Sequence, residues 1–211
     1  MNKVHIVGTG PGSHEYLLPI AKRLIEEADC LIGAERLLKI FDRLDTEKVE
    51  LKGNLKDVIP YIKENRQTKK IVVLVSGDPG IYSLSSIVRK SLKRGEYEVI
   101  PGISSMQLAF SKIGESWQDA IIISLHGRRH DNFAEMVKGS KKVFLLTDPA
   151  FPANEIAKHL LESGVTNKSL FVLENLSYKE ERVIETDLEA LSKMSDFSSL
   201  CVMIILDNEG A

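Results

Sequence analysis

The chain has 211 residues, of which 43 % are hydrophobic, so it carries enough apolar surface for one large domain or two small ones. Its 28 basic and 30 acidic residues are interspersed and give a formal net charge of −2. This distribution excludes the basic stripe with which proteins follow a phosphate backbone, and we expect no nucleic-acid partner.

Neither a membrane segment nor a metal site is indicated. No apolar run approaches the ~20 residues that span a bilayer, and the N-terminus leads into the strand-like segment 4–7 instead of a signal-peptide core. We therefore expect a cytoplasmic protein. Cys30 and Cys201 each lie in an apolar stretch without a second Cys or His at metal-ligand spacing. We interpret both as buried free thiols.

In the first half of the chain, apolar runs bounded by turn residues alternate with segments of helical period. This alternation is typical of a parallel sheet flanked by helices. The predicted strands are 4–7, 30–32, 71–75 and 98–100. Apolar residues at helical spacing over 17–28 predict the first helix, with Pro19 in its first turn.

Two more helices are predicted in this half. Residues 84–92 carry an apolar face, and this helix stops at Gly95, which can adopt the positive φ that closes a helix. The next helix begins at Ser104, which forms a capping box with Gln107, and it ends at Gly114.

The polar stretch 115–118 marks the expected boundary between two domains, 1–116 and 117–211. After it we predict strand 120–125, helix 130–138, strand 142–146, helix 153–163, strand 169–173, strand 182–186, helix 187–194 and strand 200–206. Only a short polar turn separates strands 169–173 and 182–186, so these two should pair antiparallel. The second domain is therefore expected to contain a mixed or antiparallel sheet.

A glycine-rich loop, VGTGPGS at residues 7–13, follows the first predicted strand, and its glycines allow the backbone to approach a ligand closely. It departs from the dinucleotide fingerprint G-x-G-x-x-G, because Ser13 stands where the third glycine is required. The following helix also starts late, near Pro19, so its dipole is badly placed for a diphosphate. A ligand without phosphates fits this loop better.

Two further loops follow predicted strands. In SGDPGIYS, residues 76–83, Gly77 permits close approach and Pro79 makes the turn rigid, while Asp78 either accepts from a ligand or satisfies backbone N–H groups as a turn aspartate. In PGISS, residues 101–105, one serine caps the next helix and the other is available to a ligand. Because all three loops follow strands of one predicted parallel sheet, they should cluster at one edge.

A fourth candidate is SLHGRRH, residues 124–130. Arg128 and Arg129 beside His126 form a positive site suited to carboxylates, since arginine offers a bidentate fork. The alternative is a solvated basic loop. His126 could orient a substrate or act as a base, or it could be structural.

Nearly end to end, the chain resembles the tetrapyrrole (uroporphyrin/precorrin) methylase family. The resemblance rests on VGTGPGSHEYL, LIGAERLL, SGDPGIYS, VIPGISSMQLAFSKIG, WQDAIIISLHGR and FVLENLSYKEERVIE. The glycine loop and the GDP-x-x-Tyr segment point to the family. The WQDA and SLHGR pair resembles the branch that methylates carbon 5 of cobalt-precorrin-7.

The resemblance implies a two-domain α/β fold with a ligand cleft between the domains, S-adenosylmethionine as methyl donor, and a homodimer. The positions that match the family's cofactor-contacting motifs are Gly10, Pro11, Gly77, Asp78, Pro79, Tyr82, Ser104, Ser105, Leu145 and Leu146. It transfers no catalytic base. The domain that methylates carbon 15 and decarboxylates a side chain in some relatives is absent from these 211 residues, so a separate protein would supply that step.

For the tetrapyrrole substrate, which carries many carboxylates, we expect Arg128, Arg129 and His126 to be the anchors. Two alternatives remain open at this point. A nicotinamide-dependent oxidoreductase is suggested by the glycine loop and by Glu35, which follows the second predicted strand as the ribose-binding acid of that class does. A non-catalytic small-molecule sensor is suggested by the lack of an obvious general base.

Overall fold

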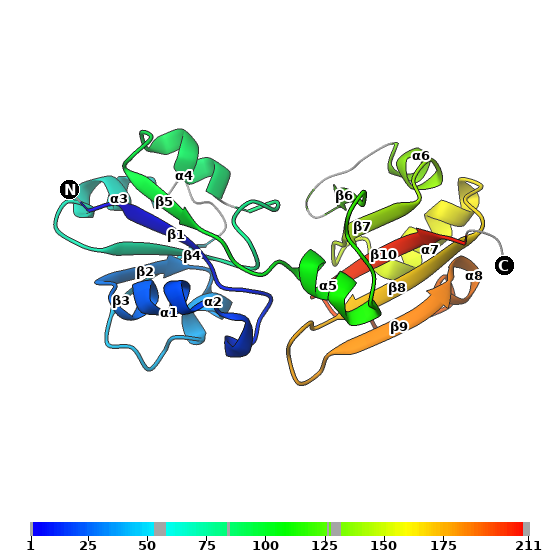
Figure 1. The fold of residues 1–211 in the computed structure, drawn as a ribbon, viewed down its shortest axis with the longest axis horizontal. Coiled ribbons are helices and arrows are strands. Elements are labelled where there is room, and N and C mark those ends of the chain that lie inside the picture. Colours follow the sequence, from blue (N-terminus) through cyan, green and yellow to red (C-terminus); the bar gives the residue numbers. More distant parts are fainter. Residues whose placement is uncertain (1, 53–57, 84, 126, 128–131, 209–211) are drawn as a thin grey trace. The chain divides into compact units, whose positions relative to one another are not determined.

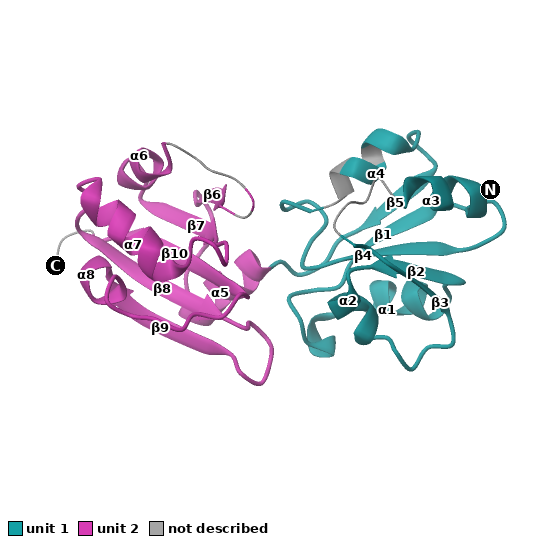
Figure 2. Cartoon of the chain, turned by 180° about the vertical axis from the view of Figure 1, so that it is seen from behind, with its two compact units in different colours: residues 1–104 teal, residues 105–211 magenta. Residues whose placement is uncertain are grey.

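A computed structural model describes residues 2–52, 58–83, 85–125, 127 and 132–208, and it divides the chain into unit 1, residues 1–104, and unit 2, residues 105–211 (Figures 1 and 2). The sequence led us to expect the division at residue 116. The difference is the helix α5 (Ser105–Ile113), which packs on strand β10 (Cys201–Asp207) and is therefore grouped with unit 2. The polar stretch 115–118 follows this helix.

The sheet of unit 1 has five parallel strands in the order β3-β2-β4-β1-β5. Its strands are β1 (Val4–Gly8), β2 (Cys30–Gly33), β3 (Glu47–Glu50), β4 (Ile71–Val75) and β5 (Tyr97–Ile100). Its helices are the 3-10 turn η1 (His14–Tyr16), α1 (Pro19–Glu26), α2 (Glu35–Lys39), α3 (Ile59–Asn65) and α4 (Ser85–Ser91). The predicted parallel sheet with flanking helices is confirmed.

Helices cover both faces of this sheet (Figure 1). Val7 and Leu74 belong to one cluster with buried residues of α1 and α2. Ile6 packs in a second cluster with α3 and α4. Burial on both faces explains why β4 is a continuous apolar run rather than an alternating one.

Four elements of unit 1, namely η1, α2, β3 and α3, were not predicted. β3 is an edge strand of sequence EKVE, so it lacks the apolar run that identifies a buried strand. The helix α2 has only five residues, too few to show a helical period. Each takes its structure from packing against neighbours, which a local pattern does not reveal.

The sheet of unit 2 is mixed, with the order β6-β7-β10-β8-β9. Its strands are β6 (Ile121–Ser124), β7 (Lys142–Leu146), β8 (Lys168–Glu174), β9 (Arg182–Asp187) and β10. Its other helices are α6 (Phe133–Lys138), α7 (Ala153–Glu162) and α8 (Leu188–Leu191). β6 and β7 are parallel, whereas β8 and β9 form the predicted antiparallel hairpin.

The helices of unit 2 lie on both faces of its sheet. Val143 and Leu145 of β7 belong to the core that includes α6, α7 and α8. Phe144, between them, points to the other face, where its ring centroid lies 6.3 Å from that of Phe110 in α5. This alternation is the period of two that a strand imposes on its side chains.

Both cysteines are free and buried, as predicted. Within the described part of the chain, no helix has the length and apolar character needed to cross a membrane. Over the same residues, no three His, Cys, Asp or Glu side chains gather as metal ligands would.

Candidate functional site

The three predicted ligand loops of unit 1 meet at one edge of its sheet. β4, β1 and β5 are neighbours and parallel, so the loops that follow them share this edge, which we call the carboxyl edge. Gly10 and Gly77 pair across it: the Gly77 N–H donates to the Gly10 carbonyl at 2.8 Å, and the Gly10 N–H donates back at 3.3 Å. The predicted clustering of the loops is confirmed.

The glycines at this edge allow the backbones of the loops to approach one another closely. A Cβ on Gly8 would lie 2.6 Å from the carbonyl oxygen of Gly77 and 2.7 Å from the nitrogen of Gly102. A Cβ on Gly10 would lie 2.8 Å from the carbonyl oxygen of Tyr16, and Gly10 also has φ +77°. Only glycine fits where three backbones approach this closely.

Asp78 joins two of the loops through its carboxylate. Its Oδ1 accepts from the Gly80 N–H at 2.6 Å, and its Oδ2 accepts from the Gly102 N–H at 3.0 Å. The role of a turn aspartate, one of the two that the sequence allowed, is therefore present in the structure. A ligand contact by the same carboxylate stays a prediction.

Tyr82 has a backbone conformation that suggests a specific role. Its φ of +41° is unusual for a residue with a side chain, and 47 % of its surface is exposed. The turn that carries Tyr82 is closed by Ser83, whose hydroxyl donates to the carbonyl of the buried Pro79 at 2.5 Å. An aromatic side chain is thus presented at the carboxyl edge on a fixed turn.

The remaining cofactor candidates on the loops after β1 and β5 are Pro11 and Ser104 of unit 1 and Ser105, the first residue of unit 2. Pro11 is partly buried in the loop after β1. Ser104 is buried, with 2 % of its surface exposed, and it directly precedes α5, which begins at the partly buried Ser105. Their ligand roles stay predictions.

Leu145 and Leu146 lie in β7 of unit 2, between β6 and β10. The side chain of Leu145 is fully buried. The carbonyl of Leu146 accepts from the N–H of Leu125 at 2.9 Å, so one of the hydrogen bonds that this carbonyl can accept is made within the protein. His126, Arg128 and Arg129 lie outside the described residues; between them, Gly127 donates its N–H to Oδ2 of Asp148 at 2.8 Å.

One further side chain at the carboxyl edge was not predicted from the sequence. Arg36, from the short helix α2, donates from Nη2 to the hydroxyl of Ser76 at 3.3 Å. Its neighbour Glu35, the candidate ribose-binding acid, forms an exposed ion pair with Lys39 at 2.7 Å. The hydrogen bond from Lys39 holds the pKa of this carboxyl below its ordinary value.

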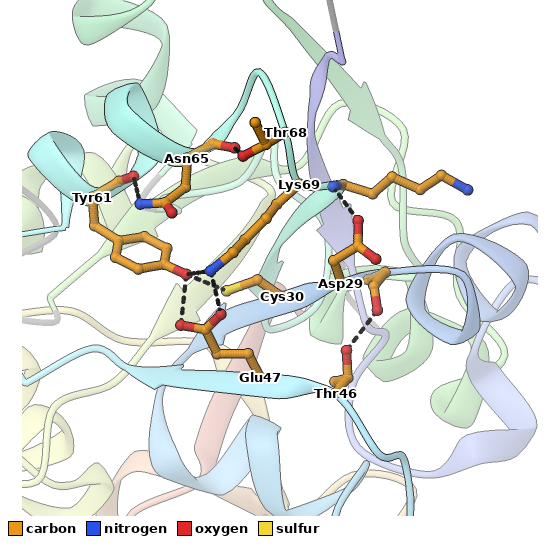
Figure 3. A network of polar contacts seen from close by, with 10 residues as sticks. Asp29, Cys30, Thr46, Glu47, Tyr61, Asn65, Thr68 and Lys69 are labelled. Carbon is orange, nitrogen blue, oxygen red and sulfur yellow. Dashed lines mark hydrogen bonds and ion pairs between the residues drawn. The ribbon is translucent and has the colours of Figure 1, made fainter.

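At the opposite, amino edge of the same sheet, side chains form a separate polar network (Figure 3). The Tyr61 hydroxyl donates to Oε1 of Glu47 at 2.7 Å, and Nζ of Lys69 donates to Oε2 of Glu47 at 2.6 Å and to the Tyr61 oxygen at 3.2 Å. Sγ of Cys30 lies 3.5 Å from that oxygen. The network joins β2, β3, α3 and the residues before β4.

Burial and hydrogen bonding shift the pKa values in this network. Burial raises the pKa of Tyr61 far above its ordinary value, and the hydrogen bonds to Cys30 and Glu47 act in the same direction. The hydrogen bonds from Lys69 and Tyr61 lower the pKa of Glu47. The network is therefore held with the tyrosine neutral and the Glu47–Lys69 pair charged at neutral pH.

The family model of the tetrapyrrole (corrin/porphyrin) methylases matches residues 3–192. The chain belongs to this family. A methylase sequence of Methanocaldococcus jannaschii, named as a probable cobalt-precorrin-7 C(5)-methyltransferase, is 35 % identical over 98 % of this chain and 99 % of its own length. A precorrin-6Y C(5,15)-methyltransferase (decarboxylating) of Sinorhizobium is 30 % identical over 98 % of this methylase but only 50 % of its own length.

Among solved structures, the methylase resembles the uroporphyrin-III C-methyltransferase of Thermus thermophilus, which was crystallised with S-adenosylhomocysteine. The TM-score is 0.78 at 22 % identity, over 97 % of this chain and 92 % of the other. This likeness confirms the two-domain α/β fold. The findings support neither alternative function, oxidoreductase or sensor.

Proposed function

We propose that this methylase transfers a methyl group from S-adenosylmethionine to carbon 5 of cobalt-precorrin-7, or of its metal-free equivalent, in cobalamin biosynthesis. The observation that carries the proposal is the 35 % identity, over essentially both full chains, to a relative named for that reaction. The Sinorhizobium relative, also named for carbon 5, supports the same assignment.

The carboxyl edge of unit 1 fits S-adenosylmethionine. Its candidate contacts are backbone groups of glycine loops, serine hydroxyls and the exposed ring of Tyr82, which suit the neutral adenosine part. The Asp78 carboxylate contributes negative charge, which favours a sulfonium cation over a diphosphate. We propose that Gly10, Pro11, Gly77, Asp78, Pro79, Tyr82, Ser104 and Ser105 contact the cofactor, with main-chain contacts from Leu145 and Leu146.

When bound, S-adenosylmethionine supplies an electrophilic methyl group. Transfer breaks the carbon–sulfur bond, whose electron pair stays on sulfur, and forms a bond to carbon 5 with an electron pair of the macrocycle. The loops of this chain contribute by holding the two reactants in line, and orientation of this kind can lower the barrier by ~7–11 kcal/mol. A strong general base is not required for the bond-forming step.

We propose that Arg128 and Arg129 bind carboxylates of the macrocycle, with His126 orienting it. Replacing both arginines by methionine should raise the KM for the corrin substrate and leave the Kd for S-adenosylhomocysteine unchanged. An unchanged KM would remove them from the substrate site.

Three finer expectations belong to this proposal. One is that a separate protein carries out the carbon-15 methylation and the decarboxylation that the name of the Sinorhizobium relative also includes; this chain aligns with 50 % of that relative's length. A homodimer is supported by exposed apolar side chains such as Trp117 and Ile121, and sedimentation or light scattering would measure it. A cytoplasmic location stays a prediction.

The test of the function is a single-turnover reaction with methyl-labelled S-adenosylmethionine and cobalt-precorrin-7. We expect label on carbon 5 and release of S-adenosylhomocysteine. Calorimetric titration in parallel should show S-adenosylhomocysteine binding and no NADH binding. Retained cofactor with an unlabelled corrin would overturn the proposal in favour of a sensor.

A further inference from the structure

The three ligand loops at the carboxyl edge follow β1, β4 and β5, and the segment after β2 reaches the same edge. β2 is parallel to β4 and pairs with it directly, so the chain leaves β2 beside the loop after β4. Neighbouring strands lie ~4.8 Å apart, which is within the reach of a long side chain. This segment carries the end of the LIGAERLL motif, residues 31–38, to which the proposed function gives no role.

The helix α2 in this segment is anchored to the core of unit 1. Its Leu37 and Leu38 are buried in the cluster that also contains Leu74 of β4. Just after the helix, the ring of Phe41 makes an edge-to-face contact with His14 of η1, with the ring centroids 5.8 Å apart. The core on one side and the loop after β1 on the other thus give the backbone of α2 a defined position.

Arg36 is the residue of α2 that reaches the ligand loops. Its Nη2 donates to the hydroxyl of Ser76 at 3.3 Å, and Ser76 directly precedes Gly77 and Asp78. The guanidinium of arginine is always charged and carries five N–H donors in a planar fork, of which this bond uses one. Because Arg36 is exposed, a ligand at the carboxyl edge can contact its side chain.

Arg36 also determines the charge that α2 brings to this edge. The other two charged residues of the helix, Glu35 and Lys39, form an ion pair at 2.7 Å and cancel each other. The remaining charge is the guanidinium of Arg36. It lies beside loops whose other candidate contacts are backbone groups, hydroxyls, an aromatic ring and the Asp78 carboxylate, so it is the group suited to an anionic part of a ligand.

We propose that Arg36 binds a carboxylate of one of the reactants at the carboxyl edge, with Ser76 orienting its guanidinium. The inference rests on the proposed function, which supplies such groups from two sources. These are the peripheral carboxylates of the corrin and the methionine carboxylate of S-adenosylmethionine. The macrocycle carries many carboxylates and the cofactor only one, so we expect the corrin to be the source.

The experiment compares Arg36→Met and Arg36→Lys in the whole chain. Met keeps an unbranched apolar stem and removes the charge, whereas Lys keeps the charge and loses the fork. Three constants are measured: the KM for cobalt-precorrin-7, the Kd for S-adenosylhomocysteine, and the Kd for 5′-methylthioadenosine, which lacks the amino-acid part of the cofactor. For Arg36→Met we expect the KM to rise about 10-fold with both Kd values unchanged, and Arg36→Lys should be intermediate.

Two further variants test the orientation and the specificity of the effect. Ser76→Ala removes the hydroxyl that accepts from Arg36 and keeps the arginine, so the KM should rise by a smaller factor, about 2–3-fold. Arg23→Met is the matched control, because Arg23 is also an exposed arginine of unit 1 but pairs with Glu27 at 3.7 Å. It should leave all three constants unchanged. Thermal unfolding of each variant checks that the fold is retained.

The outcomes separate the two sources of the carboxylate. If Arg36→Met instead raises the Kd for S-adenosylhomocysteine and leaves that for 5′-methylthioadenosine unchanged, the inference holds with the cofactor as the source. An equal rise in both Kd values overturns it, since Arg36 then supports the loop rather than binding a carboxylate.

The outcomes also separate this inference from the proposed function. An active wild type and a folded Arg36→Met variant with the same KM and Kd values overturn this inference alone. A wild type that binds S-adenosylhomocysteine but methylates no corrin overturns the proposed function. The comparison of S-adenosylhomocysteine with 5′-methylthioadenosine then decides whether Arg36 binds a carboxylate.

Discussion

The two edges of the parallel sheet in unit 1 are built by different means. At the carboxyl edge, three loops are joined by backbone hydrogen bonds, by close glycine contacts and by one carboxylate, Asp78. At the amino edge, side chains make the joints, with Tyr61, Glu47 and Lys69 linked at 2.6–3.2 Å (Figure 3). The same sheet therefore has a backbone-built edge and an edge closed by side chains.

Under the proposed function, Tyr61 and Glu47 illustrate that a perturbed ionisable group need not mark the reactive site. Shifted pKa values are often used to locate functional residues. Here the strongly raised pKa of Tyr61 and the lowered pKa of Glu47 are at the amino edge, opposite the ligand loops. Methyl transfer from a sulfonium depends on positioning more than on a tuned acid or base, so an edge made of fixed backbone is suited to it.

The largest effect is expected where the backbones of the carboxyl edge touch. Gly8→Ala places a Cβ 2.6 Å from the Gly77 carbonyl oxygen and 2.7 Å from the Gly102 nitrogen. Both are backbone atoms, so a loop backbone must move to accept the methyl group. We expect a loss of about 3 kcal/mol in the free energy of unfolding and loss of S-adenosylhomocysteine binding. Denaturant unfolding and calorimetry measure the two.

Gly139→Ala is the control for this substitution. Its φ is −83°, and its new Cβ would lie 3.4 Å from the carbonyl oxygen of Glu135, which is ordinary contact. It should change stability by less than about 1 kcal/mol. Equal effects of the two substitutions would show that the close packing at the carboxyl edge is not essential.

The next effect concerns the carboxylate of that edge. Asp78→Ala removes the acceptor for both the Gly80 and the Gly102 N–H groups, so the loops after β4 and β5 lose their link. We expect the Kd for S-adenosylhomocysteine to rise about 10-fold or more. Unchanged affinity, measured by calorimetry, would reduce Asp78 to a turn cap without influence on the cofactor.

Much of this fold could be predicted from sequence patterns, because its buried strands consist of continuous apolar residues. β4 and β7 were predicted with the bounds that the structure has, and the order of elements in unit 2 was predicted correctly. The end of α5 at Gly114 was also predicted, since a φ of +72° favours glycine there. Where packing and local pattern agree, the sequence is sufficient.

The site was predicted in part, and the missing part is geometric. The loops that carry Gly10, Gly77 and Ser104 were identified, but not the contact of Gly8 with Gly102, which requires knowing that β1 and β5 are neighbours. Arg36 was missed for the same reason, because it reaches Ser76 from a helix 40 residues earlier. Strand order, which no local pattern encodes, brings such residues together.

At the amino edge, removal of the Tyr61 hydroxyl is the test of the side-chain network. Tyr61→Phe removes the donor to Glu47 and the acceptor from Lys69 while keeping the ring. We expect a loss of about 1–2 kcal/mol in the free energy of unfolding. The Kd for S-adenosylhomocysteine and kcat should not change, and a change in either would connect the two edges functionally.

The smallest effect is the pH dependence of the same network. The hydrogen bonds from Lys69 and Tyr61 lower the pKa of Glu47 in the folded protein, so its charged form is stabilised by folding. That contribution is present above the unfolded pKa of a glutamate, about 4.3, and is lost as the pH falls through the lower folded value. Because Glu47 and Lys69 are partly exposed, we expect less than about 1 kcal/mol.

Lys69→Met measures this contribution by difference. Other carboxyls with lowered pKa, such as Glu96 and Glu181, are unaffected by the substitution and contribute equally to both proteins. The wild type should therefore be more stable than the variant at pH 7, and the gap should narrow as the pH falls below about 4. A gap that stays constant from pH 7 to 3, measured by urea unfolding, would show that Lys69 stabilises the amino edge by packing rather than by charge.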